Sequence, residues 1–417
     1  MGRRLGRTLA TLALGALGLG LGCGNDKPAQ APPSTGGPAS GVAVMMTDFA
    51  STSISLLAAD GTLAKDDCMD SGTQASGKLS LALSGDVTLP SQPQMGGDLW
   101  IVDSGNAAVT IVAPTTCTVL GQVSVSTGFK SNPHDVAVLS DKKVYVTRYD
   151  KNVAPADAMS TGDDIVILDR DAGSITGRID MSAFAAPVDG AMIQARPDRM
   201  MLIDGKVYVS LGNEDAMFSA LGEGRVAIID PASDTVTGTV SLTGLKGCSA
   251  MYYLPAAKAL FVACGGSFAD TDQAAASGIA TVDLSVTPPV LGHVTKASSF
   301  GGKPVTFFWV TALSATRAFT TVIGSLPDAK NNVPGSNDAA FVFDPTTDVA
   351  TALGLETGAF DMGRGVVGDG TLFVPDATMN KPLIHVFDVS GAGAPTEKTS
   401  LNPGPAQGLP PRELAWY

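Results

Sequence analysis

A short strand pattern recurs along this chain, and its period constrains the fold more than any other sequence feature. Six segments place one aromatic residue between two smaller, mostly apolar residues, and a seventh is a degenerate copy. A second pattern, apolar-x-apolar-apolar and usually Asp, follows each of them, and successive copies lie about 44 to 63 residues apart. This period is typical of β-propeller blades with loop insertions. The first pattern occupies residues 99–101, 144–146, 207–209, 260–262, 318–320, 372–374 and 42–44, and the second occupies 165–169, 226–230, 279–283, 340–344, 384–388, 109–113 and 54–58.

Further short strands, such as 135–139 and 174–179, lie between these pairs, so each repeat predicts four strands. The strand cores are apolar on both faces, as expected of blades that stack face to face. Residues 411–417 look like a strand that opens a blade, and the strands that would complete that blade stand at the start of the domain. We therefore expect an all-β fold, a seven-bladed β-propeller of four-stranded antiparallel blades. Its ring should close by pairing the C-terminal strand with the N-terminal blade, which removes open sheet edges.

Two repeats resemble a known family. Residues 143–147 read KVYVT and residues 206–210 read KVYVS, and each is followed by an I-L-D or I-I-D strand and a T-G-R-I or T-G-T-V strand. These segments resemble the YVTN-type β-propeller repeat family, best over residues 97–245. That family includes surface-layer, periplasmic and quinoprotein-like propellers, so the resemblance implies a shape rather than an activity.

The N-terminus predicts export. Arg3, Arg4 and Arg7 precede an apolar run over residues 9–21, which is shorter than the roughly 20 residues of a membrane-spanning helix. The run ends at Leu21-Gly22-Cys23, which resembles the lipobox of bacterial lipoproteins and implies that Cys23 is acylated, although Gly20 stands where that pattern usually has Leu. The alternative is an ordinary cleaved signal with an incidental cysteine.

These features divide the chain into three parts. Residues 1–22 are predicted to be a signal peptide, residues 23–40 the lipidated cysteine with a flexible Pro/Gly/Ser-rich tether, and residues 41–417 the propeller. The resemblance to lipoproteins implies a lipid-anchored protein of the cell envelope, on the periplasmic or outer-surface side of a bacterial outer membrane.

The charge balance limits the partners. The chain carries a formal net charge of −13, and removal of the signal would take away only positive charges. Nucleic acid and anionic membrane surfaces both attract basic proteins, so we expect no nucleic acid and no membrane contact except through the lipid anchor. A hydrophobic fraction of 44% and a charged fraction of 16% describe a globular domain, expected here to be a monomer.

Four cysteines follow Cys23, an even number that predicts disulfides in an exported chain. In a hairpin centred on Ala256, Cys248 and Cys264 stand directly opposite each other, close enough for a disulfide. Cys68 and Cys117 then remain to join the outer strands of the first and second blades. No C-x-x-C spacing occurs, so a metal site is not favoured.

Loop lengths and charges indicate where a function would lie. The loops within residues 147–164, 211–224, 264–277 and 323–337 are long and should emerge on one face of the ring. The beginnings of the innermost strands on that face carry cations that would surround the channel and could hold an anionic ligand. The alternative is that neighbouring acids such as Asp135, Asp198 and Glu413 neutralise them. The predicted anion-binding residues are Lys130, His134, Arg199, Lys303, Arg364 and Arg412, with Arg196 and Lys246 nearby.

Acidic residues outside the channel have simpler expected roles. An Asp ends five of the third strands, where a cap on the following turn is a better explanation than a metal site. Asp270 and Asp272 have oxygens suited to calcium, but the motif is very short and a solvated acidic loop is the favoured explanation.

Signatures of catalysis are sparse. The chain has only His134, His293 and His385, and it contains no haem-attachment, nucleophile-elbow, zincin or P-loop motif. The one candidate catalytic cluster is His134 with Asp135, Asp198 and Arg412. No metal and no cofactor are predicted.

The sequence therefore favours a non-catalytic binding or scaffolding module that engages a protein or an anionic small molecule through its long-loop face. One alternative is a propeller enzyme, a quinoprotein-like oxidoreductase or a metal-dependent hydrolase, with its site at the channel mouth. A further alternative is a structural surface-layer component, which would require self-association.

Overall fold

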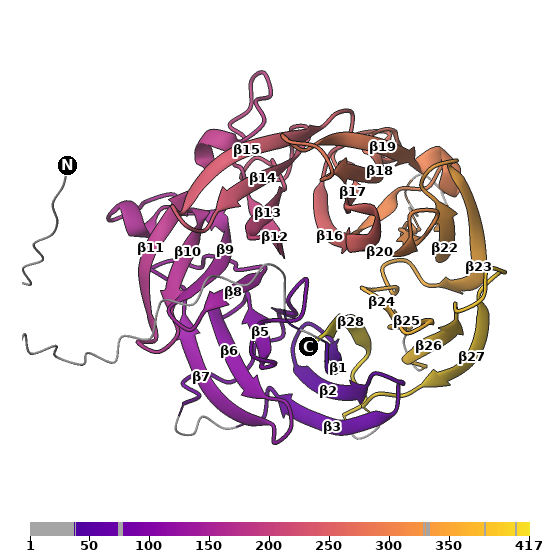
Figure 1. The fold of residues 1–417 in the computed structure, drawn as a ribbon, viewed down its shortest axis with the longest axis horizontal. Helices are drawn as coiled ribbons and strands as arrows, with labels where there is room; N and C mark the ends of the chain where they lie inside the picture. Colours follow the sequence, from indigo (N-terminus) through magenta and orange to yellow (C-terminus); the bar gives the residue numbers. More distant parts are fainter. Residues whose placement is uncertain are drawn as a thin grey trace, which may run out of the picture. The chain divides into compact units, whose positions relative to one another are not determined.

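The computed structural model describes residues 37, 39–73, 78–327, 330, 334–378, 381–404 and 407–417. Within these residues the chain forms seven four-stranded antiparallel sheets arranged as a ring (Figure 1). The predicted seven-bladed β-propeller is therefore confirmed. The predicted signal peptide, Cys23 and most of the tether lie outside the described residues, and no helix that is described is both long and apolar enough to cross a membrane.

Each sheet is one blade, and its four strands lie side by side in order from the channel to the rim. Blade 1 has the order β28-β1-β2-β3, and blades 2 to 7 follow in chain order from β4–β7 to β24–β27. The innermost strands are β28 (Pro411–Trp416), β4 (Val87–Thr88), β8 (Val136–Ser140), β12 (Pro197–Ile203), β16 (Cys248–Leu254), β20 (Val305–Ser314) and β24 (Val366–Gly368). The second strands are β1 (Gly41–Thr47), β5 (Leu99–Asp103), β9 (Lys143–Lys151), β13 (Lys206–Leu211), β17 (Ala259–Gly265), β21 (Arg317–Val322) and β25 (Thr371–Asp376).

The outer half of each blade follows the same scheme. The third strands are β2 (Thr52–Ala58), β6 (Ala108–Ala113), β10 (Gly162–Asp169), β14 (Gly224–Asp230), β18 (Ser277–Asp283), β22 (Asp338–Asp344) and β26 (Leu383–Asp388). The outermost are β3 (Leu63–Asp70), β7 (Thr118–Ser124), β11 (Ser174–Asp180), β15 (Thr235–Leu242), β19 (Val290–Lys296), β23 (Val349–Thr357) and β27 (Thr396–Leu401).

Burial falls from the middle of each blade to its rim. Every residue of β5 is buried, whereas β15 alternates and most of β27 is exposed. The second and third strands are buried on both faces because adjacent blades cover them, which explains why the repeat reads as continuous apolar runs.

The ring closes as predicted. Strand β28 pairs with β1 in antiparallel register, with Val42 opposite Trp416 and Val44 opposite Leu414. The last strand of the chain thus completes the first blade, and β1 is not left as an open sheet edge.

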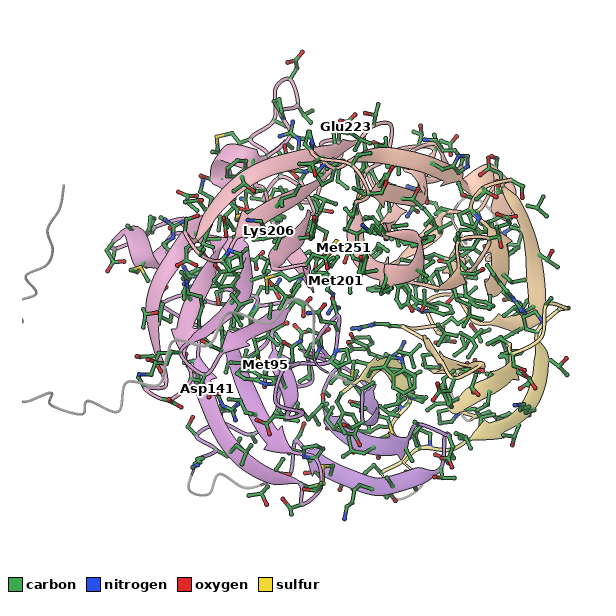
Figure 2. All side chains as sticks on the ribbon, viewed as in Figure 1. Met95, Asp141, Met201, Lys206, Glu223 and Met251 are labelled. Carbon is green, nitrogen blue, oxygen red and sulfur yellow. A yellow bond between two sulfur atoms is a disulfide. The ribbon has the colours of Figure 1, made fainter. Side chains whose placement is uncertain are left out.

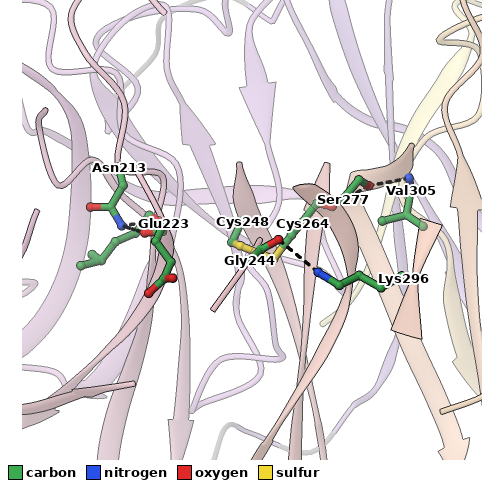
Figure 3. The surroundings of a disulfide bond; sticks show 9 residues. Asn213, Glu223, Gly244, Cys248, Cys264, Ser277, Lys296 and Val305 are labelled. Carbon is green, nitrogen blue, oxygen red and sulfur yellow. Dashed lines mark hydrogen bonds between the residues drawn. A yellow bond between two sulfur atoms is a disulfide. The ribbon is translucent and has the colours of Figure 1, made fainter. Parts of the chain in front are cut away.

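Both predicted disulfides are present. Cys68 on β3 is bonded to Cys117, which immediately precedes β7, so the bond joins the rims of blades 1 and 2. The Cys248–Cys264 disulfide joins β16 to β17 within blade 5 and lies beside Lys296, which donates a hydrogen bond to the carbonyl of Gly244 (Figure 3).

The register around Cys248 differs in one detail from the sequence prediction. The hairpin pairs Leu254 with Ala259, one residue out of step with a turn centred on Ala256. A one-residue irregularity between Cys248 and Met251 restores the alignment, and Cys248 faces Cys264 after all. The pairing was predicted correctly, but a β-bulge was needed to achieve it.

The aspartates that end the third strands cap turns, as predicted. Each accepts a backbone hydrogen bond from a residue two or three positions later, as when Asp388 accepts from the N–H of Ser390. The hydroxyl of Ser390, together with this backbone bond and Lys398, lowers the pKa of Asp388 to about 2. The equivalent bonds are made by Asp169, Asp230, Asp283 and Asp344.

Candidate functional site

Two cavities open along the central channel. One, of about 390 Å³, is lined by the beginnings of the innermost strands and lies on the face that carries the long loops. We call it the mouth cavity and call that side the long-loop face. The other, of about 500 Å³, is lined by the far ends of the same strands and includes Met201 and Met251, which are labelled near the ring centre in Figure 2. Arg199, Phe308 and Arg364 line both cavities and therefore separate them.

Glu413 neutralises two of the predicted cations at the floor of the mouth cavity. Its carboxylate lies 2.7 Å from Nη1 of Arg364 and 3.6 Å from Nη2 of Arg199. Burial disfavours the charged form of both arginines. For Arg199 the neighbouring acids outweigh burial and raise the pKa, whereas for Arg364 burial prevails and the pKa is lowered. The two arginines also donate to the carbonyl of Leu89 at 3.0 Å. Their charges and donors are therefore already engaged by groups of the protein, and the floor is not a ring of unpaired cations.

His134 is held by partners on both ring nitrogens. Nδ1 lies 2.8 Å from Asp198, Nε2 lies 3.2 Å from Oδ1 of Asn132, and the ring stacks on Tyr149 at 4.3 Å between centroids. Burial disfavours ionised Asp198, but His134 and Arg199 outweigh it and lower its pKa. The His134–Asp198 pair therefore lies at the cavity, but both ring nitrogens of His134 already have hydrogen-bond partners.

Asp135, the third member of the candidate catalytic cluster, lies beneath the surface. It is fully buried and accepts hydrogen bonds from the N–H and hydroxyl of Ser91 and from the N–H of Met200. Burial raises its pKa. Its bonds connect blades 2, 3 and 4, which is a structural role.

The other predicted cations have different surroundings. Lys303 donates to the carbonyl of Asn337 at 3.2 Å, and neither it nor Lys130 is among the residues that line the mouth cavity. Lys246 pairs with Asp270 at 3.0 Å, and Arg196 pairs with Asp150 at 2.9 Å. The structure brings together His134, Arg199, Arg364 and Arg412 at the cavity, and anion binding by this set stays a prediction.

Arg412 differs from the floor arginines. Nη1 donates to the carbonyl of Phe360 at 2.9 Å, Nε lies 3.4 Å from the carbonyl of Thr47, and the guanidinium sits over the ring of Phe49 at 4.8 Å. No carboxylate among the described residues lies within ion-pair distance of it. Its positive charge therefore faces the cavity without a direct counterion.

An aromatic cluster at the cavity was not predicted. Phe268 lies 6.0 Å from Phe307 and 6.4 Å from Phe360 between ring centroids, and Phe307 lies 4.0 Å from Phe308. Phe49 lines the cavity from blade 1. Phe49, Phe268, Phe308 and Phe360 keep 70%, 59%, 42% and 41% of their surface exposed. We call these five residues the mouth phenylalanines, and a gathering of exposed rings at a cavity is typical of a binding site.

Bulges in the innermost strands aim these side chains into the channel. Val305 of β20 pairs with Val322 of β21, and the next pair is Val310 with Thr320. Five residues of β20 thus correspond to two of β21, and the unpaired residues of β20 include Phe307 and Phe308. The pairing of β28 with β1 likewise skips Arg412. Irregular pairing beside a site commonly redirects side chains, and a repeat pattern in the sequence does not reveal it.

Backbone geometry holds two of the rings in place. Phe49 and Phe360 both have left-handed backbones, with φ of 67° and 64°, which is unusual for a bulky residue. The buried carboxylate of Asp338 fixes the backbone at Phe360, because it accepts hydrogen bonds from the N–H groups of Phe360 and Met362 at 3.1 and 3.0 Å. Strained residues held this firmly concentrate at ligand sites.

The described residues contain no group of three or more His, Cys, Asp or Glu side chains placed to hold a metal ion. Asp270 pairs with Lys246, and Asp272 accepts from the N–H of Ala275 as the cap of a short helix.

The fold and this site define a disulfide-bonded seven-bladed β-propeller with an aromatic cavity at one channel mouth. No protein-family model and no curated protein matches the chain. Among solved structures, a candidate 6-phosphogluconolactonase from Bacteroides uniformis is similar, with a TM-score of 0.54 and 12% identity over 91% of this chain and 100% of that one.

Two further structures are similar with lower scores. The hydrazine synthase of Kuenenia stuttgartiensis has a TM-score of 0.46 and 13% identity over 76% of this chain and 80% of that one. The dihydro-heme d1 dehydrogenase NirN has a TM-score of 0.46 and 14% identity over 93% of this chain and 77% of that one. At these identities the likeness shows the fold alone.

Proposed function

We propose that the protein is an envelope-anchored lipoprotein propeller of the YVTN type that binds a partner or ligand, without catalysis, through its long-loop face. The observation that carries this proposal is the group of mouth phenylalanines, which come from four regions far apart in the sequence. Four of them line one cavity, and Phe268 packs against Phe307 and Phe360. Keeping that much apolar surface exposed is unfavourable unless something covers it.

The residues before β1 and the two disulfides also bear on this role. Gly37 and Ala39 line the second cavity, of about 500 Å³, and the N–H of Gly37 donates to the carbonyl of Pro93 at 2.8 Å. These two residues precede β1 and lie on the side of the propeller opposite the mouth cavity. The two disulfides fit an oxidising compartment outside the cytoplasm.

The geometry of His134 bears on the enzyme alternative. A general base needs a ring nitrogen free to meet the substrate, but Asp198 and Asn132 occupy both nitrogens at 2.8 and 3.2 Å. This arrangement favours a role for His134 in shaping the cavity.

Photo-cross-linking in the producing bacterium tests the binding role. The photoreactive residue p-benzoylphenylalanine would replace Phe268 on the long-loop face and, as a control, Val349 at the exposed start of β23. We expect an adduct of defined mass from position 268 only, and that mass would distinguish a protein partner from a small molecule. The absence of an adduct at 268, or equal adducts at both positions, would contradict the proposal.

Metabolic labelling tests the anchor. Radiolabelled palmitate should enter the wild-type protein and keep it in the membrane fraction, whereas Cys23→Ser should be unlabelled and released. Equal labelling, or equal partition of both proteins, would show that Cys23 is not the lipid site.

A further inference from the structure

The mouth cavity presents an aromatic wall and, on Arg412, a cation that has no ion-pair partner among the described residues; this combination points to a ligand class. We infer that the cavity binds a small apolar monocarboxylate, with its carboxylate on the guanidinium of Arg412 and its hydrocarbon body against the mouth phenylalanines. The inference deepens the proposed binding function and rests on it.

The size of the cavity sets the first limit. Its volume of about 390 Å³ lies near the lower end of the range for small-molecule sites. Phe49, Phe307, Phe308 and Phe360 line it together with Met45 and Met362, so most of the ligand would contact apolar side chains. A compact body of one or two rings, or a short branched chain, suits that surface.

The charges of the cavity favour one anionic group in one place. At the floor, Glu413 already pairs with Arg364 and Arg199, and Asp198 already pairs with His134, so an anion placed there would meet carboxylates. Arg412 lies at the aromatic side of the cavity. Among the described residues no acceptor bonds its Nη2, which leaves a donor for a carboxylate oxygen.

The nearest acids do not cancel the charge of Arg412. Asp338 is buried and accepts from the N–H groups of Gly324, Phe360 and Met362. Asp361 makes no ion pair within the described part of the chain, although it lies close enough to Arg412 to affect its ionisation. Asp361 would therefore compete weakly with a bound carboxylate, and its removal should strengthen binding.

The position of Arg412 is built into the fold. A side-chain carbon on Gly363 would overlap the carbonyl oxygen of Arg412, so glycine is required where the two segments meet. The N–H of Arg364 donates to that carbonyl at 3.0 Å, and the carbonyl of Arg364 accepts from the N–H of Leu414 at 2.9 Å. The guanidinium is thus held beside the rings before any ligand arrives, which favours binding.

Titration calorimetry on the full chain tests this inference with 4-phenylbutyrate and its neutral isostere 4-phenylbutanamide. The acid should bind about tenfold more tightly than the amide, because a charge-assisted hydrogen bond replaces a neutral one. In Arg412→Gln the two probes should bind alike, and in Asp361→Asn the acid alone should gain affinity about threefold. Lys303→Gln is the matched control, because it removes a cation outside the cavity lining and should leave the tenfold ratio unchanged.

The outcomes separate the two proposals. Equal binding of acid and amide to the wild-type protein, or binding of neither at millimolar concentration, would overturn the monocarboxylate inference. A specific cross-link at position 268 would then still support the binding function, whereas its absence as well would remove both. If Arg412→Gln unfolds, the comparison of probes on the wild type and on Asp361→Asn still decides the question.

Discussion

At the scale of single residues, the strained aromatic positions mark the site best. Phe49 is 70% exposed, so burial of its ring stabilises the fold little, yet its backbone is left-handed at φ 67°. That conformation is unfavourable for a bulky residue by about 1 to 2 kcal/mol. The N–H of Phe49 donates to the hydroxyl of Thr47 at 2.9 Å, which in turn donates to the carbonyl of Gly85. The fold therefore holds this ring at the cavity at the expense of stability.

Phe49→Asn tests that view. Asn tolerates the left-handed region, so the free energy of unfolding in urea should not fall and should rise by up to about 1 kcal/mol. Binding of 4-phenylbutyrate should weaken in the same protein. Phe308→Asn is the control, because Phe308 lines the cavity without a left-handed backbone and should give no gain in stability. A loss of stability in Phe49→Asn would show that the ring packs more than its exposure indicates.

At the scale of elements, close contacts between blades depend on individual side chains. Gly224, at the start of β14, lies so close to Cys248 of blade 5 that a side-chain carbon would overlap the disulfide sulfur. Figure 3 shows the neighbouring bond from Asn213 to the carbonyl of Glu223, which is 2.9 Å long and holds the loop just before this contact. Blade 4 thus approaches blade 5 through a residue without a side chain.

Gly224→Ala should therefore lower the free energy of unfolding by about 1 to 3 kcal/mol, the usual effect of overpacking a rigid contact. Chemical denaturation measures it. Gly121→Ala on β7 is the matched control, because its new carbon would meet only Ile111 at 3.9 Å, and its stability should change by less than about 0.5 kcal/mol. Equal effects of the two substitutions would disprove the tight contact.

Blade 7 carries a pH-dependent contact. His385 on β26 lies 2.7 Å from Glu397 on β27 and 3.3 Å from Asp376 on β25, so its partners belong to its own blade. Burial disfavours the imidazolium, but the hydrogen bonds to Asp376 and Glu397 outweigh it and raise the pKa of His385. The resulting stabilisation is complete below about pH 6.5 and is lost as the pH rises through the raised pKa.

His385→Gln should therefore destabilise the protein more at pH 5.5 than at pH 9, by on the order of 1 kcal/mol. Thermal melting of both proteins at the two pH values provides the measurement. His293→Gln is the control, since its pair with Asp348 is 43% exposed on each side and should contribute less. A difference between wild type and His385→Gln that does not vary with pH would contradict this account.

At the scale of the whole molecule, one strand pairing closes the ring and one disulfide joins two neighbouring blades beside that closure. Strand β28 closes blade 1, and the Cys68–Cys117 disulfide joins blade 1 to blade 2 across 49 residues. The disulfide limits the conformations of the unfolded chain over a long loop, whereas the Cys248–Cys264 bond spans 16 residues of a single hairpin.

The double variant Cys68→Ala, Cys117→Ala should thus lose about 2 to 4 kcal/mol of unfolding free energy. The double variant Cys248→Ala, Cys264→Ala should lose less, because its loop is shorter. Denaturation in guanidinium compares the two without added reductant. The opposite order would mean that packing of the blade 5 disulfide, and not loop closure, dominates.

The sequence by itself determined the blades. The spacing of the apolar strands, the lone C-terminal strand and the turn-capping aspartates depend on local patterning and on a repeat, and both are readable along the chain. The partner of Cys248 followed from the same local reasoning, because it lies across one hairpin.

The tertiary structure alone decided the site. Glu413 meets Arg364 across 49 positions and Arg199 across still more, so a list of cations could not tell which ones are neutralised. The mouth phenylalanines at 49, 268, 307, 308 and 360 share no spacing, and an irregularity in β20 turns two of them into the channel. A repeat fixes what recurs in every blade, whereas a binding site at the ring centre is formed by what differs between blades, and only closure of the ring brings those differences together.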